Sequence, residues 1–227
     1  MDRLGSPSHS SGVRAATRDD IPVIARIHKT QFAGHLLARY SLTLIERFYM
    51  AFLDEALFLV HEGEGGIDGF VVGAERRVCG MCRRAFVRAS VLRSALETLW
   101  KPQLALGAIR QASRSFLPRR HAPHTSPPFR LLSIAVDPIA AGTGVAAALV
   151  WAFERSIPGG FATYGLSVRE GNVRAIRFYE KMGFRRESVD TAVGHCYYAK
   201  ETPDRCQSMS CEDEDTVADG ELRRLAG

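Results

Sequence analysis

The chain has 227 residues, of which 46% are hydrophobic, and its formal net charge is +5. This length is enough for one hydrophobic core of ordinary size. No run approaches the roughly 18 apolar residues that a membrane-spanning helix needs, and the first residues lack the apolar stretch of a secretory signal. The five cysteines follow no disulfide framework, so the composition argues against a disulfide-rich secreted domain and predicts a cytoplasmic protein.

Two of the cysteines, Cys79 and Cys82, have the C-x-x-C spacing found in zinc and redox sites. A zinc site needs a second pair at a similar spacing, and Cys206 and Cys211 stand in an acidic segment without the pattern of a folded element. We therefore interpret Cys79 and Cys82 as ordinary thiols and expect no metal site.

The first half of the chain predicts a strand, two helices and a hairpin. Residues 1–12 are rich in Ser and Gly, and we expect them to be disordered. Proline at position 22 suits the first turn of a helix, and the glycine-rich residues 63–66 suit a hairpin turn. The expected elements are a strand at Val13–Thr17, helices from Ile21 to about His28 and across Leu42–Leu53, and hairpin strands at Leu57–His61 and Ile67–Ala74.

A basic segment follows the hairpin. Residues 79–120 have apolar residues at helical spacing with arginines between them, and residues 121–128 form a proline-rich loop. Residues 76–120 contain eleven Lys and Arg against one Glu, a net charge of +10. Three interpretations stay open: a solvated helix face, recognition of an acidic small substrate, and contact with an anionic surface. Aromatic residues are too sparse here for sequence-specific nucleic-acid recognition.

The second half of the chain predicts alternating strands and helices. We expect strands at Phe129–Val136 and Phe161–Val168, a helix at Asn172–Met182, and closing strands at Phe184–Val189 and Cys196–Lys200. Residues 201–227 hold eight acidic side chains against three arginines, and we expect a disordered tail. The order of elements predicts one mixed α/β domain over residues 13–200.

The segment Leu131–Trp151 reads LLSIAVDPIAAGTGVAAALVW. Pro138 ends the strand, Gly142 and Gly144 permit a tight turn, and an alanine-rich helix begins directly afterwards. Such a turn leaves backbone N–H groups free at a helix N-terminus, where an anion can bind. The segment is neither a P-loop nor a dinucleotide fingerprint. By itself the pattern is also compatible with a turn that only connects a strand to a helix.

The segment Leu166–Phe184 reads LSVREGNVRAIRFYEKMGF. Asn172 stands at a helix start, and Tyr179 shares one helix face with Val173, Ile176 and Met182. A tyrosine in this pattern is, taken alone, more typical of a hydrophobic core than of a catalytic site.

The two segments in this order resemble the GNAT N-acetyltransferase superfamily, through AVDPIAAGTGVAAALV followed by REGNVRAIRFYEKMGF. The N-terminal VRAATRDDIPVIARIH is similar to the superfamily's opening strand and helix. The resemblance covers residues 13–200 apart from much of the basic segment, and an insert between strands 3 and 4 resembles a bacterial-type subgroup. It implies a mostly antiparallel sheet, splayed at strands 4 and 5 and flanked by helices.

The resemblance also implies acetyl-CoA as co-substrate and a role for individual residues. A strand backbone would bond the pantetheine arm, a turn would bind the pyrophosphate, a side chain at a helix start would contact the cofactor, and a tyrosine would protonate the departing thiolate. The matching positions are Ile134, Ala135 and Val136 for the strand, Gly142, Thr143, Gly144, Val145, Ala146 and Ala147 for the turn, then Asn172 and Tyr179.

Two positions depart from the superfamily's pattern. Ala141 stands where Arg or Gln is usual, and Ser167 stands where members that acetylate protein N-termini often carry a glutamate. The general base is therefore unassigned, and His35, Glu75, His121 and His124 are candidates from loops or strand ends.

The expected activity is transfer of an acyl group to a primary amine of a small molecule, such as an amino sugar, by direct attack. Two alternatives stay open: acetylation of protein N-termini or lysines, and a non-catalytic module that binds acyl-CoA or docks on an anionic surface. A monomer and a homodimer are both compatible with the sequence.

Overall fold

The computed structural model describes residues 12–100, 127–191 and 194–203, with the side chains of residues 91–100 left out. Its strands are β1 Gly12–Ala15, β2 Leu57–Gly63, β3 Gly66–Glu75, β4 Phe129–Val136, β5 Thr163–Arg169, β6 Arg185–Asp190 and β7 His195–Glu201. Its helices are α1 Ile21–Gln31, α2 Leu42–Met50, α3 Arg76–Trp100, α5 Val145–Ser156 and α6 Val173–Lys181, with short 3-10 turns at Arg18–Asp20, Leu37–Arg39 and Pro138–Ala140.

The seven strands of the described residues form one sheet in the order β1-β2-β3-β4-β5-β7-β6. Neighbouring strands are antiparallel, except that β4 and β5 are parallel. This confirms the expected mixed, mostly antiparallel sheet.

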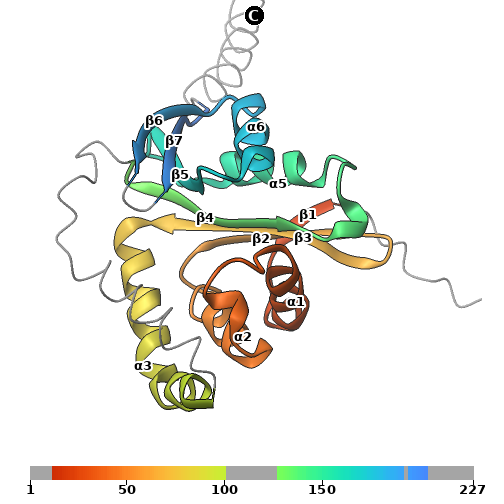
Figure 1. The fold of residues 1–227 in the computed structure, drawn as a ribbon. Coiled ribbons are helices and arrows are strands. Elements are labelled where there is room, and N and C mark those ends of the chain that lie inside the picture. Colours follow the sequence, from red (N-terminus) through yellow and green to blue (C-terminus); the bar gives the residue numbers. More distant parts are fainter. Residues whose placement is uncertain (1–11, 101–126, 192–193, 204–227) are drawn as a thin grey trace, which may run out of the picture.

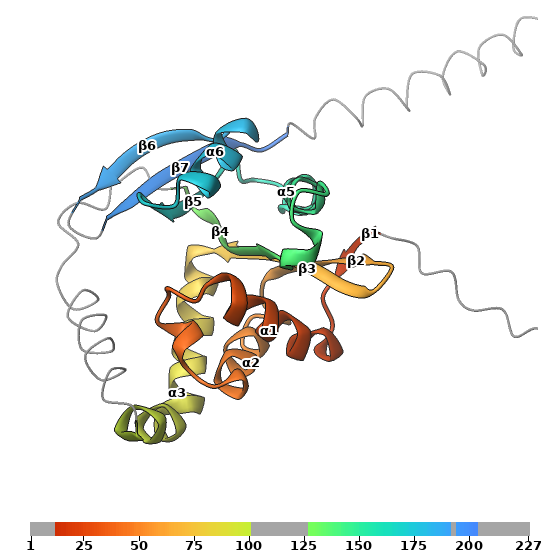
Figure 2. The same cartoon turned by 45° about the vertical axis from the view of Figure 1, so that its right-hand side comes forward.

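Helices cover both faces of the sheet. Figures 1 and 2 show α1, α2 and α3 on one face and α5 and α6 on the other. Each face has its own core: Leu149, Phe153 and Tyr164 belong to the cluster on the α5 side, whereas Ile24 and Tyr49 belong to the cluster on the α1 side. Apolar residues at helical spacing on α1, α2 and α5 produce these two cores.

Local signals place the helix starts. The backbone N–H of Thr17 donates to Asp20 Oδ2 at 2.8 Å, and Pro22 lies in the first turn of α1. The Ser41 hydroxyl accepts from the backbone N–H of Leu44 at 3.3 Å and caps α2. Both helices therefore begin where the sequence predicts.

Several expected boundaries were wrong by a few residues. The first strand ends at Ala15 because Thr17 leads into the 3-10 turn and donates to Asp20, α1 continues to Gln31, and α2 ends at Met50. Helix α3 begins at Arg76, directly after β3, and residues 101–120 of the expected helical insert lie outside the described residues.

Disorder was expected for residues 1–12 and 201–227, and this expectation was wrong for Gly12 and Glu201, the residues of each segment that adjoin the domain. Gly12 pairs with Glu62 of β2 and is the first residue of β1. Glu201 pairs with Thr163 of β5 and is the last residue of β7. The remaining residues of those two segments lie outside the described part of the chain. Among the described residues, no helix is long and apolar enough to cross a membrane.

Candidate functional site

Strands β4 and β5 separate along most of their length. They pair only at Phe129 with Tyr164 and at Arg130 with Gly165, although β4 continues to Val136. This confirms the splay that the resemblance implies. We call the unpaired stretch of β4 and β5 beyond these two pairs the β4–β5 opening.

A β-bulge on β4 accompanies the separation. On β3, Gly73 faces Leu131 but its neighbour Val72 faces Ser133, so Leu132 has no partner opposite it. A bulge bends its strand and increases the local twist. The bend begins directly after Arg130, where pairing with β5 ends, so it explains why β4 leaves its neighbour there.

Residues Ile134, Ala135 and Val136 lie on the separated part of β4. On one side they pair with Val71, Phe70 and Gly69 of β3, and on the other side they have no pairing with β5. A strand with an unpaired edge offers backbone N–H and C=O groups to an extended ligand. These three residues therefore present an unpaired strand edge to which an extended, amide-containing ligand can bond.

The turn after β4 ends at a helix N-terminus. Gly142 and Gly144 adopt φ angles of 89° and 93°, and Gly144 is the N-cap of α5. Only glycine adopts this left-handed backbone without strain. A Cβ atom at either glycine would meet nothing within 4 Å, so the turn is open to its surroundings.

The first turn of α5 has free backbone donors. Gly144 has no side chain with which to cap the helix, and the intrahelical bonds begin with Ala148 N–H to Gly144 C=O at 3.0 Å. The amides of Val145, Ala146 and Ala147 therefore have no acceptor within the helix. The Thr143 hydroxyl donates to the Ala140 carbonyl at 2.8 Å and holds the turn in shape. This arrangement fits an anion such as a pyrophosphate.

Helix α6 begins at Asn172, whose Oδ1 atom accepts from the backbone N–H of Ala175 at 3.2 Å. The side-chain oxygen thus caps the helix, and the exposed side chain keeps its NH₂ group for other partners. A contact between Asn172 and the co-substrate stays a prediction.

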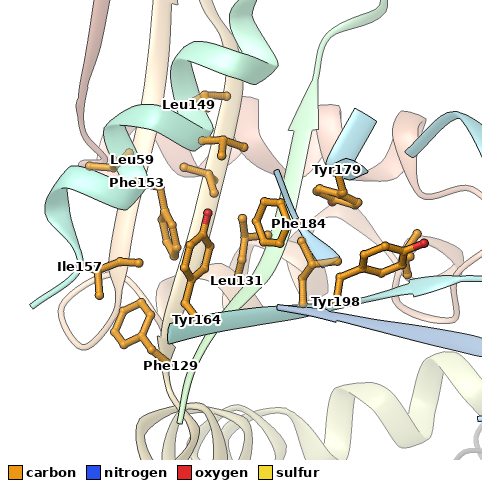
Figure 3. Close-up of a cluster of buried hydrophobic side chains, with 14 of the residues drawn as sticks. Leu59, Phe129, Leu131, Leu149, Phe153, Ile157, Tyr164, Tyr179, Phe184 and Tyr198 are labelled. Atoms are coloured by element: carbon orange, nitrogen blue, oxygen red, sulfur yellow. The ribbon is translucent and has the colours of Figure 1, made fainter. Parts of the chain in front are cut away.

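Tyr179 lies on the buried face of α6 and is 8% exposed. Its ring packs edge-on against Phe184 at 5.5 Å, and Figure 3 shows the two rings side by side in the core on the α5 side. Burial raises the pKa of Tyr179 to about 12, so the phenol is protonated at neutral pH, as a proton donor must be. Within the described residues, its hydroxyl makes no hydrogen bond. Tyr179 is thus both a core residue and a group suited to general-acid catalysis.

A buried polar chain on the opposite face escaped the sequence analysis. His28 Nδ1 lies 2.7 Å from the Tyr49 hydroxyl, which lies 3.3 Å from Ser133 Oγ on the separated part of β4. Burial lowers the pKa of His28 to about 4 and raises that of Tyr49, so all three groups are neutral at pH 7. The signal was the presence of His28 and Tyr49 on otherwise apolar helix faces.

The structure separates the four candidate bases. Glu75 faces Phe129, at the end of β4 where β5 is still paired, and so lies away from the β4–β5 opening. His121 and His124 lie outside the described residues. His35 lies in the turn after α1, close enough to Arg169 and His195 for their charges to affect its pKa.

The two departures from the superfamily's pattern lie on the surface. Ala141 is exposed in the glycine turn, and Ser167 is exposed on β5 opposite Tyr197. Ala141 offers no side chain that could bind a phosphate, and Ser167 offers no carboxylate that could accept a proton. Among the described residues, no group of three His, Cys, Asp or Glu side chains is arranged to hold a metal ion.

Residues 112–184 match the model of the acetyltransferase (GNAT) family, a range that includes β4, α5, β5 and α6. No curated protein matches the sequence.

Solved structures with the same fold include SsHAT, at 22% identity and a TM-score of 0.63 over 86% of this chain and 100% of that one. Ard1 from Thermoplasma volcanium matches at 20% identity and a TM-score of 0.51, over 86% of this chain and 99% of that one. A ribosomal-protein-alanine N-acetyltransferase from Brucella melitensis matches at 17% identity and a TM-score of 0.53, over 83% and 98%.

Proposed function

We propose that this chain is a GNAT-type acetyltransferase, in keeping with the family model that matches residues 112–184, and that it transfers the acetyl group of acetyl-CoA to a primary amine of a small molecule. One observation carries the proposal: β4 and β5 separate after two residue pairs, and the loop leaving β4 ends at the uncapped N-terminus of α5. An unpaired strand edge and an anion site are thus joined by one short turn. Together they suit a ligand with an extended amide arm and a pyrophosphate.

The donor would bind along this continuous stretch. The backbone of Ile134–Val136 would bond the pantetheine arm, and the amides of Gly142–Ala147 would bind the pyrophosphate. Asn172, exposed at the start of α6, would add a contact from the other side of the β4–β5 opening. Because Ala141 offers no charged side chain, backbone amides would carry the phosphate binding.

The reaction would proceed by direct attack of the amine on the thioester. A C–N bond forms, the C–S bond breaks, and Tyr179 protonates the departing thiolate. A backbone N–H near Val136 would stabilise the developing oxyanion. The free cysteines of the described residues, Cys79, Cys82 and Cys196, are all buried, which supports direct transfer over an acyl-cysteine intermediate. The proposed location is the cytoplasm, in keeping with five cysteines that follow no disulfide framework.

The first turns of helix α3 support a second proposal, peripheral contact with an anionic surface. Arginines at positions 76, 77, 83, 84 and 88 stand on its first four turns, and Met81 and Val87 are exposed among them. Basic and apolar side chains together suit peripheral contact with an anionic surface. Sedimentation with anionic vesicles at low and high salt tests this contact, and salt-insensitive or absent binding would exclude it.

Two measurements test the main proposal. Calorimetric titration with acetyl-CoA should show saturable binding, and a thiol-release assay should then show turnover with at least one amine from a panel of amino sugars, polyamines and peptides. Turnover with peptides alone would favour a protein acceptor. Binding without release for any amine would favour a non-catalytic acyl-CoA module, and absence of binding would refute the proposal.

A further inference from the structure

The turn after α1 lies against the end of β5. A Cβ atom built on Gly34 would lie 3.5 Å from a guanidinium nitrogen of Arg169, so this turn passes directly beside that side chain. The next residue is His35, whose backbone N–H donates to the Phe32 carbonyl at 2.7 Å. Arg169 itself pairs with His195 of β7. Three basic side chains from three separate elements therefore meet here, and we call them the rim cluster.

The rim cluster lies at the open end of the β4–β5 opening. Arg169 is the last residue of β5, whereas β4 and β5 are paired at the other end of that strand, at Tyr164 and Gly165. The carbonyl of Arg169 accepts from the N–H of Asn172 at 2.9 Å, so the cluster adjoins the start of α6.

The cluster approaches the opening from the side of α1. The ring of His35 packs against Phe32 with centroids 5.2 Å apart, and Phe32 packs against His28 at 4.7 Å, within the core on the α1 side. The glycine turn, α5 and Tyr179 belong to the other face. If α5 and α6 hold acetyl-CoA on their face of the sheet, the acceptor amine would enter from the face that α1 covers.

Two members of the rim cluster, His35 and Arg169, differ in charge at neutral pH. His35 is exposed at the surface, but desolvation by the residues around it and the positive charges of Arg169 and His195 lower its pKa below its usual value of 6.5. His28, which faces His35 from α1, also has a lowered pKa and is neutral at pH 7. His35 is therefore a neutral proton acceptor beside a permanent cation. Within the described residues, Arg169 has no ion-pair partner.

We infer that Arg169 binds an anionic group of the acceptor amine and that His35 is the general base of the transfer. A guanidinium binds carboxylate and phosphate through paired N–H donors, and both anions share this recognition chemistry. The inference rests on the proposed function and names its substrate class: primary amines that carry a carboxylate or a phosphate.

Two side chains, His35 and Tyr179, accept and supply the protons of the transfer. The neutral amine attacks the thioester carbon, and bond formation makes its nitrogen acidic, so one N–H proton passes to His35. The C–S bond then breaks and the sulfur takes the proton of Tyr179. The proton on His35 returns through solvent to the Tyr179 oxygen, which restores both residues.

Paired acceptors test the role of Arg169. The thiol-release assay is run with 4-aminobutyrate against butylamine, and with 2-aminoethyl phosphate against ethanolamine. We expect a kcat/KM at least about tenfold higher for the anionic member of one or both pairs, because charge-assisted hydrogen bonds contribute energies of this size. The pair that shows the preference tells whether Arg169 binds a carboxylate or a phosphate. Arg169→Gln should raise KM for the anionic amine by about tenfold and leave the neutral amine unchanged. Arg26→Gln, at an exposed arginine of α1, is the control and should change neither.

The pH profile tests the role of His35. In the unaltered protein at saturating amine, kcat should fall on the acidic side as His35 takes up a proton. His35→Gln should lower kcat by about 100-fold, leave the KM for acetyl-CoA unchanged and remove the acidic limb. A merely structural histidine would not control that limb, so an unchanged profile would overturn the assignment.

The outcomes separate this inference from the proposed function. Failure to bind acetyl-CoA would refute the proposed function itself. Binding and turnover without preference for the anionic amines, or equal preference in Arg169→Gln, would overturn the inference alone. If acetyl-CoA binds but no amine turns over, 4-aminobutyrate and 2-aminoethyl phosphate are titrated calorimetrically into the complex of the protein with CoA. Binding to the unaltered protein that is lost in Arg169→Gln supports the inference. Absence of binding to the unaltered protein overturns it.

Discussion

The phenol of Tyr164 donates a 2.6 Å hydrogen bond to Glu154, and this bond joins β5 to α5 beside the last paired residues of β4 and β5. Lys200 of β7 lies 2.5 Å from the same carboxylate oxygen, and Glu154 is 7% exposed. The buried carboxylate thus ties three elements together on the closed side of the β4–β5 opening. We interpret this contact as the anchor that keeps the separation of the strands local.

Glu154→Leu should destabilise the protein by about 3 kcal/mol or more, because it removes one partner of a buried ion pair and leaves the Lys200 charge uncompensated. The double variant Glu154→Leu/Lys200→Met should recover part of this loss. Chemical denaturation of the three proteins measures the difference. Equal stability of the single variant and the unaltered protein would show that the contact is not an anchor.

His28 should make the folded protein sensitive to acid. Its pKa is about 4 in the folded state and about 6.5 in the unfolded chain, so between these values the unfolded state binds more protons. The stability from neutral His28 is therefore complete above pH 6.5 and is lost as the pH falls to 4, by about 3 kcal/mol in all.

Denaturation at a series of pH values checks this expectation. His28→Asn keeps a polar group near the Tyr49 hydroxyl but removes the titration, so its stability should depend on pH less steeply between 6.5 and 4. Identical slopes for the two proteins would contradict the assignment of this acid sensitivity to His28.

Tyr179→Phe should lower kcat by about 100-fold, the range of a lost general acid, while the Kd for acetyl-CoA stays nearly unchanged. The substitution keeps the ring against Phe184 and removes only the hydroxyl. Steady-state kinetics and calorimetry measure the two quantities. Tyr197→Phe on β7 is the matched control and should retain activity, whereas full turnover by Tyr179→Phe would exclude Tyr179 from the mechanism.

The glycine turn and the start of α6 were predictable because their signals are local. Proline at 138 cannot continue the strand ladder, the glycines at 142 and 144 adopt positive φ angles, and Asn172 caps the helix with its own side chain. Each residue dictates the backbone at its own position, so the sequence alone locates these features.

The remaining parts of the site depend on pairing between distant segments. The bulge at Leu132 is defined only by its register against β3, and Tyr49 meets Ser133 across 84 residues of sequence. The same holds for His35, which was one of four candidate bases until the fold placed it beside Arg169. Local patterns do not encode such contacts, because they arise from the order of strands and the packing of helices on them.

The central claim is that the glycine turn beside the β4–β5 opening binds the pyrophosphate of acetyl-CoA. Gly144→Val tests it with a matched control, Gly160→Val, because Gly160 has nearly the same φ angle, 95°, and equally open surroundings in the loop before β5. Both variants should lose a similar 1–2 kcal/mol of stability, roughly the cost of a left-handed residue with a side chain.

The most direct measurement is calorimetric titration of acetyl-CoA into the unaltered protein and these two variants. We predict saturable one-to-one binding in the unaltered protein and in Gly160→Val, and a loss of at least about tenfold in affinity in Gly144→Val, where the side chain meets the phosphate. Equal affinity in all three proteins, or no binding by the unaltered protein, would contradict the account.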